Sequence, residues 1–267
     1  MAKAIAVCNQ KGGVGKSTTA VNVGSYLALS GKRILLVDLD PQGNATVSCG
    51  VSRSRTTNTL YEALVDGLSV EEALIASAVD LSALMDTGQA GRMDLMPSSS
   101  ELVWIDQKLA QAQDRDTALK RLCEPLRSRY DAILFDCPPS LGLLTVNALV
   151  AADCALIPVQ CEYLALEGLN TLLKTIERVK QTLNPTLAIG GIVLTMADFR
   201  ANLAREVAEE LKRFFKDLVC NTSIPRNVRL AESPSFGKPV CLYDPDSTGA
   251  QAYKLLAKEL AVKTGLV

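Results

Sequence analysis

Apolar runs of strand length alternate with amphipathic segments of helix length along the chain. The apolar runs predict strands at 3–8, 33–38, 94–96, 131–136, 154–159, 187–195 and 219–224. The run at 33–38 (RILLVD) is apolar almost throughout, which is typical of a parallel strand buried on both faces. Strands that alternate with helices in this way predict a mainly parallel sheet with crossover helices.

Positions with a helical period predict helices at 16–30, 100–112, 116–129, 143–151, 165–183, 202–217 and 247–263. Gly31 follows the first of these helices and suits its C-cap. Residues 50–92 have the least regular pattern and predict short helices with a loop. Because no repeat, low-complexity tract or linker interrupts the chain, we expect a single domain over residues 1–267. Its predicted class is α/β, with three α/β/α layers around the sheet.

The amino-acid composition limits the possible chemistry of the protein more than it limits the possible folds. Apolar residues make up 48% of the 267 residues and charged residues 21%, which leaves ample material for a core. Histidine is absent, so an imidazole general base is excluded. The eight cysteines form no C-x-x-C pair; buried, reduced thiols are the simplest interpretation, and they favour a cytoplasmic protein. The net charge of −1 does not by itself indicate a nucleic-acid partner.

A glycine-rich loop follows the first predicted strand and opens the first predicted helix. It consists of Lys11, Gly12, Gly13, Val14, Gly15, Lys16, Ser17 and Thr18. Such a turn leaves backbone N–H groups free to bind phosphate oxygens, and the start of the helix adds the positive end of its dipole. In this P-loop pattern, Lys16 reaches the β- and γ-phosphates and Ser17 holds Mg²⁺. The loop therefore predicts a nucleoside triphosphate site and a P-loop NTPase type of fold.

The loop departs from the ordinary P-loop pattern at its start. Gln10 stands where that pattern has a glycine, and Lys11 adds a second cation beside the phosphates. An exposed lysine before a turn is common, so a special role for Lys11 depends on the motif around it.

Aspartates end two of the predicted strands and could complete the site. Asp38 and Asp40 follow the second strand, and Asp136 ends the run AILFD. Ligands bind beyond the carboxyl ends of parallel strands, so these side chains are expected near the phosphate loop. A carboxylate such as Asp40 can orient the attacking water, although DPQG is also a good turn sequence and Asp38 is explained equally well by a turn. Asp136 matches the Walker B pattern, so Ser17, Asp40 and Asp136 are the candidate magnesium ligands.

The motifs KGGVGKST (11–18), VDLDPQGN (37–44) and FDCPPSLG (135–142) together resemble the deviant-Walker ATPases, and specifically the ParA-type partition ATPases. The stretches IPRNVRLAE (224–232), PSFGKP (234–239) and YDP (243–245) are also similar to this family, so the resemblance covers essentially the whole chain. The chain resembles the short form, without an N-terminal helix-turn-helix domain.

The resemblance implies a role for each motif residue. Lys11 would be the signature lysine, which crosses a dimer interface to the ATP of the partner. Lys16 would be the Walker A lysine, Asp40 would position the hydrolytic water, and Asp136 would be the Walker B acid. The resemblance also implies that the adenine is contacted by Pro225, Arg226 and Asn227. ATP and Mg²⁺ are the implied cofactors, bound in a nucleotide-sandwich homodimer.

A locally basic segment could bind DNA. Residues 200–238 carry eight basic and five acidic side chains. The helix within it can be read as a solvated charged face, whereas Arg226 and Arg229 occur in a tightly patterned loop. The resemblance implies that Arg200 and Arg229 bind DNA non-specifically, in the ATP-bound dimer.

Three functions remain open. The first is a nucleoid-associated cytoplasmic ATPase that positions a chromosome, plasmid or organelle, with slow intrinsic hydrolysis that a ParB-like partner stimulates. The second is a membrane-associated positioning ATPase of the MinD type. We expect no stable membrane binding, because the helix at 247–263 has no separate basic and apolar extension and packing on the domain explains it better. The third is a metabolic enzyme on the same fold, such as an ATP-dependent ligase or amidase.

Overall fold

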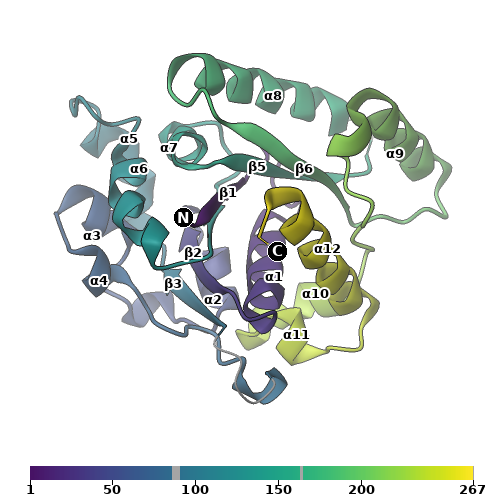
Figure 1. Cartoon of the computed structure of the whole chain (residues 1–267), viewed down its shortest axis with the longest axis horizontal. Helices are drawn as coiled ribbons and strands as arrows, with labels where there is room; N and C mark the ends of the chain where they lie inside the picture. Colours follow the sequence, from purple (N-terminus) through teal and green to yellow (C-terminus); the bar gives the residue numbers. More distant parts are fainter. Residues whose placement is uncertain (86–90, 163–164, 267) are drawn as a thin grey trace.

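Six parallel strands form one central sheet in the order β3-β2-β4-β1-β5-β6 (Figure 1). The computed structural model describes residues 1–85, 91–162 and 165–266. The strands are β1 (Lys3–Val7), β2 (Arg33–Asp38), β3 (Arg92–Met96), β4 (Ala132–Asp136), β5 (Cys154–Gln160) and β6 (Ala188–Thr195). The predicted α/β class with a parallel sheet is confirmed.

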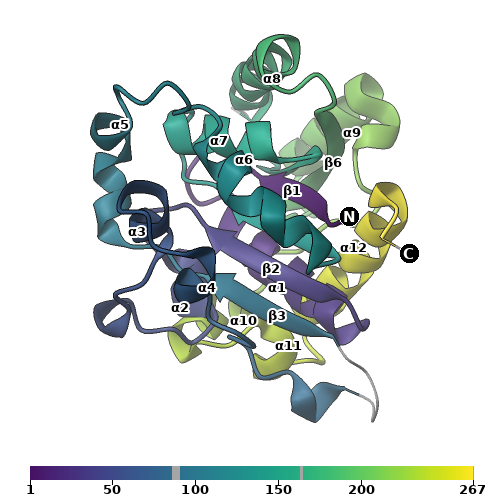
Figure 2. The ribbon, with the colours of Figure 1, turned by 60° about the vertical axis from the view of Figure 1, so that its left-hand side comes forward.

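Helices cover both faces of the sheet (Figure 2). One layer contains α1 (Lys16–Leu29), α2 (Asn44–Ser48), α10 (Val228–Glu232), α11 (Val240–Tyr243) and α12 (Thr248–Thr264). The other contains α3 (Leu60–Val65), α4 (Val70–Ala73), α5 (Ile105–Lys108), α6 (Ala118–Cys123), α7 (Leu143–Ala151), α8 (Ala165–Thr182) and α9 (Asn202–Phe215). Short 3₁₀ turns connect them, at Arg53–Arg55, Ser82–Leu84, Ser100–Trp104, Glu124–Ser128, Lys216–Leu218 and Ser233–Phe236.

Strand β2 shows why the apolar runs carry so few polar residues. Its side chains alternate between the two faces of the sheet. Leu35 and Val37 belong to the core on the α7 side, whereas Ile34 and Leu36 belong to the core on the α1 side. Because both faces are covered by helices, both sets must be apolar.

The predicted strand at 219–224 is wrong. The segment runs beside β6 but forms only isolated bridges, from Ile192 to Val219 and from Ala197 to Pro225. Two of its backbone N–H groups, those of Asn221 and Thr222, donate to the carboxylate of Glu259 on α12, at 2.7 and 2.9 Å. A side chain of α12 therefore takes the donors that a continuous edge strand would present.

Two predicted helices are shorter than expected. The segment 116–129 is α-helical only from Ala118 to Cys123 and continues as a 3₁₀ helix, because Pro125 has no N–H group for the next α-helical hydrogen bond. The segment 100–112 begins as a 3₁₀ helix, and its α-helical part ends at Lys108. The short helices predicted within 50–92 are confirmed, although residues 86–90 lie outside the described part of the chain.

Helix α1 lies close to the sheet at Gly24. A Cβ atom at this position would lie 2.9 Å from Sδ of Met93 and 3.1 Å from Cδ1 of Leu134, closer than ordinary van der Waals contact. The absence of a side chain at residue 24 thus allows the helix that starts at the glycine-rich loop to pack directly on β3 and β4.

Replacing Gly24 with alanine is expected to destabilise the protein by about 1–3 kcal/mol, because overpacking outweighs the higher helix propensity of alanine. Gly168→Ala in α8 is the matched control, since its Cβ atom would meet nothing within 4 Å. The control should be neutral or stabilise by up to about 1 kcal/mol. Urea unfolding of both variants measures the difference, and equal stability of the two would refute the packing argument.

Candidate nucleotide-binding site

The glycine-rich loop connects the end of β1 to the start of α1. Gly13 and Gly15 have φ values of +74° and +86°, a left-handed conformation that favours glycine. Two hydrogen bonds hold the base of the loop: the Asn9 amide donates to the carbonyl of Pro158 at 2.7 Å, and the Thr195 hydroxyl donates to that of Val14 at 2.8 Å. The ends of β5 and β6 therefore fix the shape of the loop.

The backbone amides of this loop are available to an anion. Within residues 1–85, 91–162 and 165–266, no acceptor takes the N–H groups of residues 12–18. They lie at the start of α1, a 14-residue helix whose dipole is positive at this end. This combination of free donors and helix dipole is suited to phosphate oxygens.

The two lysines of the loop occupy different environments. Lys16 is buried, and its ammonium group donates to the backbone carbonyl of Lys11 at 3.1 Å. Burial lowers the pKa of Lys16, while the carboxylates of Asp136 and Asp40 act in the opposite direction. The Lys11 ammonium points elsewhere and forms an ion pair with Glu162 at the end of β5. Lys11 and Lys16 thus have different partners, a surface carboxylate and a backbone carbonyl.

The aspartates predicted from the strand ends have separate roles. Asp38 accepts hydrogen bonds from the backbone N–H and the hydroxyl of Thr46, both at 2.7 Å. Burial raises the pKa of Asp38 to about 6, although the bonds from Thr46 oppose that shift. Asp38 therefore anchors the start of α2, as a turn-forming residue would. The Thr46 hydroxyl also accepts from the N–H of Ser98, whose own hydroxyl donates to the carbonyl of Asp40.

This network fixes the loop that carries Asp40. One carboxylate oxygen of Asp40 accepts from the N–H of Gln42 at 2.9 Å, and the side chain is almost fully buried. Sequence reasoning missed Thr46 and Ser98, because single hydroxyl residues within apparent turns give no spacing signal.

Asp136 lies at the centre of the sheet edge. In the register of the sheet it pairs with Val7 of β1 and with Asp38 of β2. Its carboxylate is fully buried, and neither oxygen has a hydrogen-bond partner among the described residues. Burial, and next the neighbouring charge of Asp38, raises the pKa of Asp136 well above its usual range, whereas Ser17 and Lys16 act in the opposite direction.

An unpartnered buried carboxylate beside a serine hydroxyl fits magnesium. No group of three or more Asp, Glu, Cys or His side chains that could hold a metal occurs in the described part of the chain. Mg²⁺ does not need such a cage, because it keeps several waters and binds one or two carboxylates together with phosphate oxygens. Asp136 and Ser17 fit that pattern, and Asp40 lies close enough to influence the pKa of the same carboxyl.

The segment predicted to contact adenine lies at the same edge of the sheet. Ala197 follows β6 and pairs with Pro225, and Thr195 at the end of that strand bonds the phosphate loop. The Asn227 side chain caps α10 by accepting from the N–H of Arg229, and its amide donates to Thr248. Arg226 follows Pro225 in this loop.

The arginines predicted to bind DNA already form ion pairs. Arg200 pairs with Asp198 at 2.7 Å, although 91% of its side chain is exposed. Arg229 pairs with Glu232 at 3.0 Å and with Asp244 at 3.1 Å. Arg200 lies between β6 and α9, whereas Arg229 lies in α10.

The cysteines and the C-terminal helix lie in the environments expected from the sequence. All eight cysteines are buried without a disulfide. No described helix is long and apolar enough to cross a membrane. The amphipathic helix α12 buries Tyr253, Leu256 and Leu260 against the core, and the Tyr253 hydroxyl lies 3.1 Å from that of Thr19 in α1.

A phosphate cradle at a helix start, a buried lysine and an unpartnered Walker B carboxylate define the class of P-loop nucleotide-binding proteins. Comparisons with known proteins agree with that class. A family model described as an AAA domain matches residues 2–189. The sporulation initiation inhibitor protein Soj of Bacillus subtilis is 50% identical over 261 residues, which cover 98% of this chain and 99% of that protein. The chromosome partitioning protein ParA of Myxococcus xanthus is 47% identical over 256 residues, 96% of this chain and 87% of that protein.

Solved structures share the fold. The crystal structure of cobyrinic acid a,c-diamide synthase from Mycobacterium smegmatis with bound ADP and magnesium has a TM-score of 0.82 and 35% identity. It covers 99% of this chain, which in turn covers 97% of it. The cell division ATPase MinD of Pyrococcus furiosus has a TM-score of 0.74 and 26% identity, with 98% of this chain and 99% of that chain covered. The chain therefore belongs to the Soj/ParA family of partition ATPases.

The Asp136 carboxylate leads to a prediction about pH. In the folded protein Asp136 holds its proton to a higher pH than the ordinary value of about 4 in the unfolded chain. Above about pH 4 the unfolded chain has lost this proton while the folded protein still holds it. The free energy of unfolding therefore falls as the pH rises from about 4 towards the folded pKa. Asp136→Asn replaces this titrating group with a neutral amide and should stabilise the nucleotide-free protein by on the order of 1–3 kcal/mol at pH 8.

Thermal unfolding between pH 5 and pH 8 with a metal chelator measures this effect. The gain in Tm should grow as the pH rises, and Mg²⁺ with ATP should stabilise the unmodified protein more than the variant. A variant that is less stable at every pH would contradict the account of a strained, unpartnered carboxylate.

Proposed function

We propose that this protein is a magnesium-dependent ATPase that dimerises on binding ATP, binds DNA non-specifically as the dimer, and positions a cargo. The proposal depends on one observation: the N–H groups of the glycine-rich loop have no acceptor, and the buried, unpartnered carboxylate of Asp136 lies beside them. Its relatives named as chromosome-partitioning proteins favour a chromosome as the cargo. The family resemblance of the sequence motifs implies a ParB-like protein as the partner that stimulates hydrolysis. Residues 1–267 would act as one domain, in the cytoplasm and on the nucleoid.

The loop would bind the triphosphate through its amides and Lys16. A buried ammonium group with a lowered pKa is stabilised by an incoming anion, so Lys16 gains from binding phosphate. Ser17 and Asp136 would hold Mg²⁺, partly through water, and the bound ion would neutralise charge on the phosphate oxygens. Pro225, Arg226 and Asn227 would form the adenine side of the site.

Asp40 would orient the water that attacks the γ-phosphate. Its position is held by the hydrogen bonds to Gln42 and Ser98, so the carboxylate is preorganised. Arg53 lies beyond α2, in the 3₁₀ turn Arg53–Arg55, and its guanidinium donates to the carbonyls of Pro41 and Gln42, both at 2.6 Å. Because Arg53 is already engaged, we expect slow intrinsic turnover that a partner protein accelerates.

Lys11 would complete the site of a second subunit. Its ion pair with Glu162 joins two side chains that are 40% and 47% exposed, and pairs of that kind contribute less than about 1 kcal/mol. Lys11 can therefore leave Glu162 at little cost and reach the phosphates of a partner across the interface.

DNA binding would follow from dimerisation. If each subunit neutralises about three phosphates, log affinity falls with log salt at a slope of about −2.7 for a monomer and about −5 for a dimer. Arg200 and Arg229 are the candidate contacts. Because Arg229 faces two carboxylates, DNA would have to compete with Glu232 and Asp244 for its guanidinium.

A metabolic ATP-dependent enzyme is the second candidate, favoured by the 35% identity to a structure named as a diamide synthase. A cavity beside the acidic loops, lined in part by Pro41, Pro138 and Gly142, has a volume of about 140 Å³. A neighbouring cavity that shares Gly142 and Leu143 has a volume of about 330 Å³, within the range of about 300–1,000 Å³ usual for small substrates, so cavity volume does not separate the two functions. ATP turnover that depends on a small acid and on glutamine or ammonia, without DNA, would instead support the enzyme.

DNA retention tests the proposed switch. With ATP, the unmodified protein should bind DNA, and Asp40→Ala should hold it longer while hydrolysing little. Lys16→Ala should not bind, because it cannot hold the triphosphate. Retention of the unmodified protein and of both variants on a DNA-coated surface is measured with and without ATP. Equal retention under every condition would contradict the proposal that ATP controls DNA binding.

Removal of the Glu162 charge tests the role of Lys11. In an Asp40→Ala background, Glu162→Gln should lower the ATP concentration needed for dimerisation by up to about fivefold, because the competing ion pair is lost. Glu167→Gln, also exposed and on the neighbouring α8, is the matched control. Light scattering during an ATP titration gives the midpoint. The idea fails if Glu162→Gln needs more ATP or behaves like its control.

A further inference from the structure

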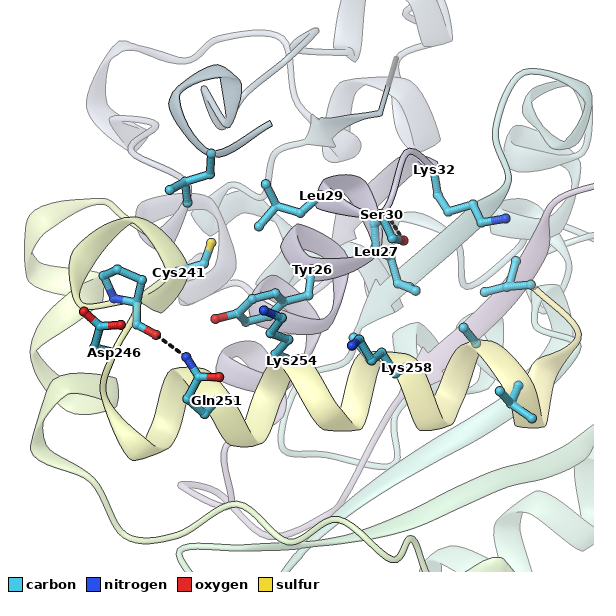
Figure 3. Close-up of a pocket in the computed structure, with 16 residues that line it drawn as sticks. Tyr26, Leu27, Leu29, Ser30, Lys32, Cys241, Asp246, Gln251, Lys254 and Lys258 are labelled. Carbon is cyan, nitrogen blue, oxygen red and sulfur yellow. Dashed lines mark hydrogen bonds between the residues drawn. The ribbon is translucent and has the colours of Figure 1, made fainter. Parts of the chain in front are cut away.

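A second, separate cavity lies at the far end of α1. It has a volume of about 740 Å³ and forms a groove between α1 and α12, closed at one end by α11 (Figure 3). Helix α1 begins at the phosphate loop and ends here, about 20 Å away at 1.5 Å per residue. We call this cavity the α1–α12 groove; residues that carry its chemistry are Tyr26, Leu27, Lys32, Lys254, Lys258 and Ala261.

The floor of the groove is apolar and its edges expose apolar side chains. Leu27 and Ala257 line the floor and are buried. Leu84 and Val262, which also line the groove, are 44% and 70% exposed. Large apolar side chains at the rim of an apolar groove are typical of a surface that is covered by a partner.

Three lysines border the same groove. Lys254 and Lys258 lie one turn apart on α12, and Figure 3 shows both side chains reaching from α12 towards α1. Lys32 lies just beyond the end of α1. None of the three has an acidic partner within 4 Å in the described residues, and Asp246 is the acid that lines the opposite end. A net positive groove on a chain of net charge −1 calls for an anionic occupant.

We propose that the α1–α12 groove binds an acidic amphipathic helix of another protein. Apolar side chains at i, i+3, i+4 and i+7 of such a helix would fill the floor, and glutamates on its flank would face Lys254 and Lys258. The stretch of α12 from Gln251 to Val262 spans about 17 Å, the length of three helical turns. The positive end of the helix dipole would lie near Asp246 and the negative end near Lys32.

Other anionic partners use this surface less completely. Duplex DNA offers phosphates but no apolar stripe for Leu27 and Ala261. A flat membrane cannot reach a floor that lies between two helices. An acidic helix satisfies both the lysines and the floor, and because the groove is about 20 Å from the phosphate loop, its binding should not require nucleotide.

A designed peptide tests the proposal with the full-length protein. The probe is a fluorescein-labelled helix with leucines on one face and glutamates beside them, and fluorescence anisotropy measures its Kd. We expect saturable binding that Lys254→Glu with Lys258→Glu weakens at least about tenfold, equivalent to 1.4 kcal/mol. Lys174→Glu with Lys180→Glu, the same charge change on α8, should leave Kd within about twofold, since these lysines are remote from the groove.

Further arms separate charge from packing. A peptide with lysine in place of each glutamate, and one with the leucines shuffled out of register, should bind at least about tenfold more weakly. Ala261→Phe, which fills the floor without changing charge, should weaken binding similarly while Tm stays within a few degrees. These effects should be the same with and without ATP.

Three results would overturn the proposal. The first is no saturable binding of the acidic peptide to the unmodified protein. The second is equal affinity of the unmodified protein and the double variant Lys254→Glu, Lys258→Glu. The third is loss of binding to duplex DNA or to phosphatidylglycerol vesicles in that variant while peptide binding persists, which would assign the lysines to that surface instead.

Discussion

Both oxygens of Asp136 are buried at the end of β4 without a hydrogen-bond partner of good geometry in the described part of the chain, although the Ser17 hydroxyl lies close enough to lower the pKa of the carboxyl. An isolated carboxylate in such a place destabilises a folded protein, so the surrounding structure must hold it there. Strands β1 and β2 do so from either side in register, and Lys16 supplies the nearest positive charge. A buried carboxylate beneath free loop amides would suit a bound cation and the phosphates that accompany it.

The unsatisfied groups of the site explain how it can act as a switch. Without ligand, the amides of residues 12–18 lack acceptors and Lys11 rests on Glu162 at the surface. Nucleotide and magnesium would satisfy the amides and Asp136 together, and a second subunit would give Lys11 a stronger partner than Glu162. Binding free energy is therefore available to drive association, which is what a nucleotide-dependent dimer requires.

Much of the fold and the centre of the site could be predicted from the sequence, because periodicity and motif spacing are local signals. The six strands, α1, α7, α8, α9 and α12 lie close to the predicted ranges. The prediction of an edge strand at 219–224 is wrong because Glu259, far along the chain, accepts hydrogen bonds from the N–H groups of Asn221 and Thr222. Thr46, Ser98 and Glu162 were missed for a similar reason, since their roles depend on partners that only the tertiary structure brings together.

The α1–α12 groove had no sequence signal either. Lys254 and Lys258 look like an ordinary solvated helix face until α1 is placed beside them. The two ends of α1 thus carry different chemistry: a phosphate cradle at its start and an apolar, basic groove at its end. Because these two ends lie about 20 Å apart, each site can be occupied without the other.

The central claim is that Lys11 acts on the nucleotide of the other subunit while Lys16 and Asp40 act on their own. Mixing Lys11→Ala with Asp40→Ala, each inactive alone, tests it by ATPase assay. In the mixed dimer, the Lys11→Ala subunit keeps Asp40 and receives Lys11 from its partner, which makes one complete site. Random pairing should then restore about a quarter of the unmodified activity. If the mixture stays as inactive as either variant while mixed dimers form, Lys11 acts within its own subunit and the account is wrong.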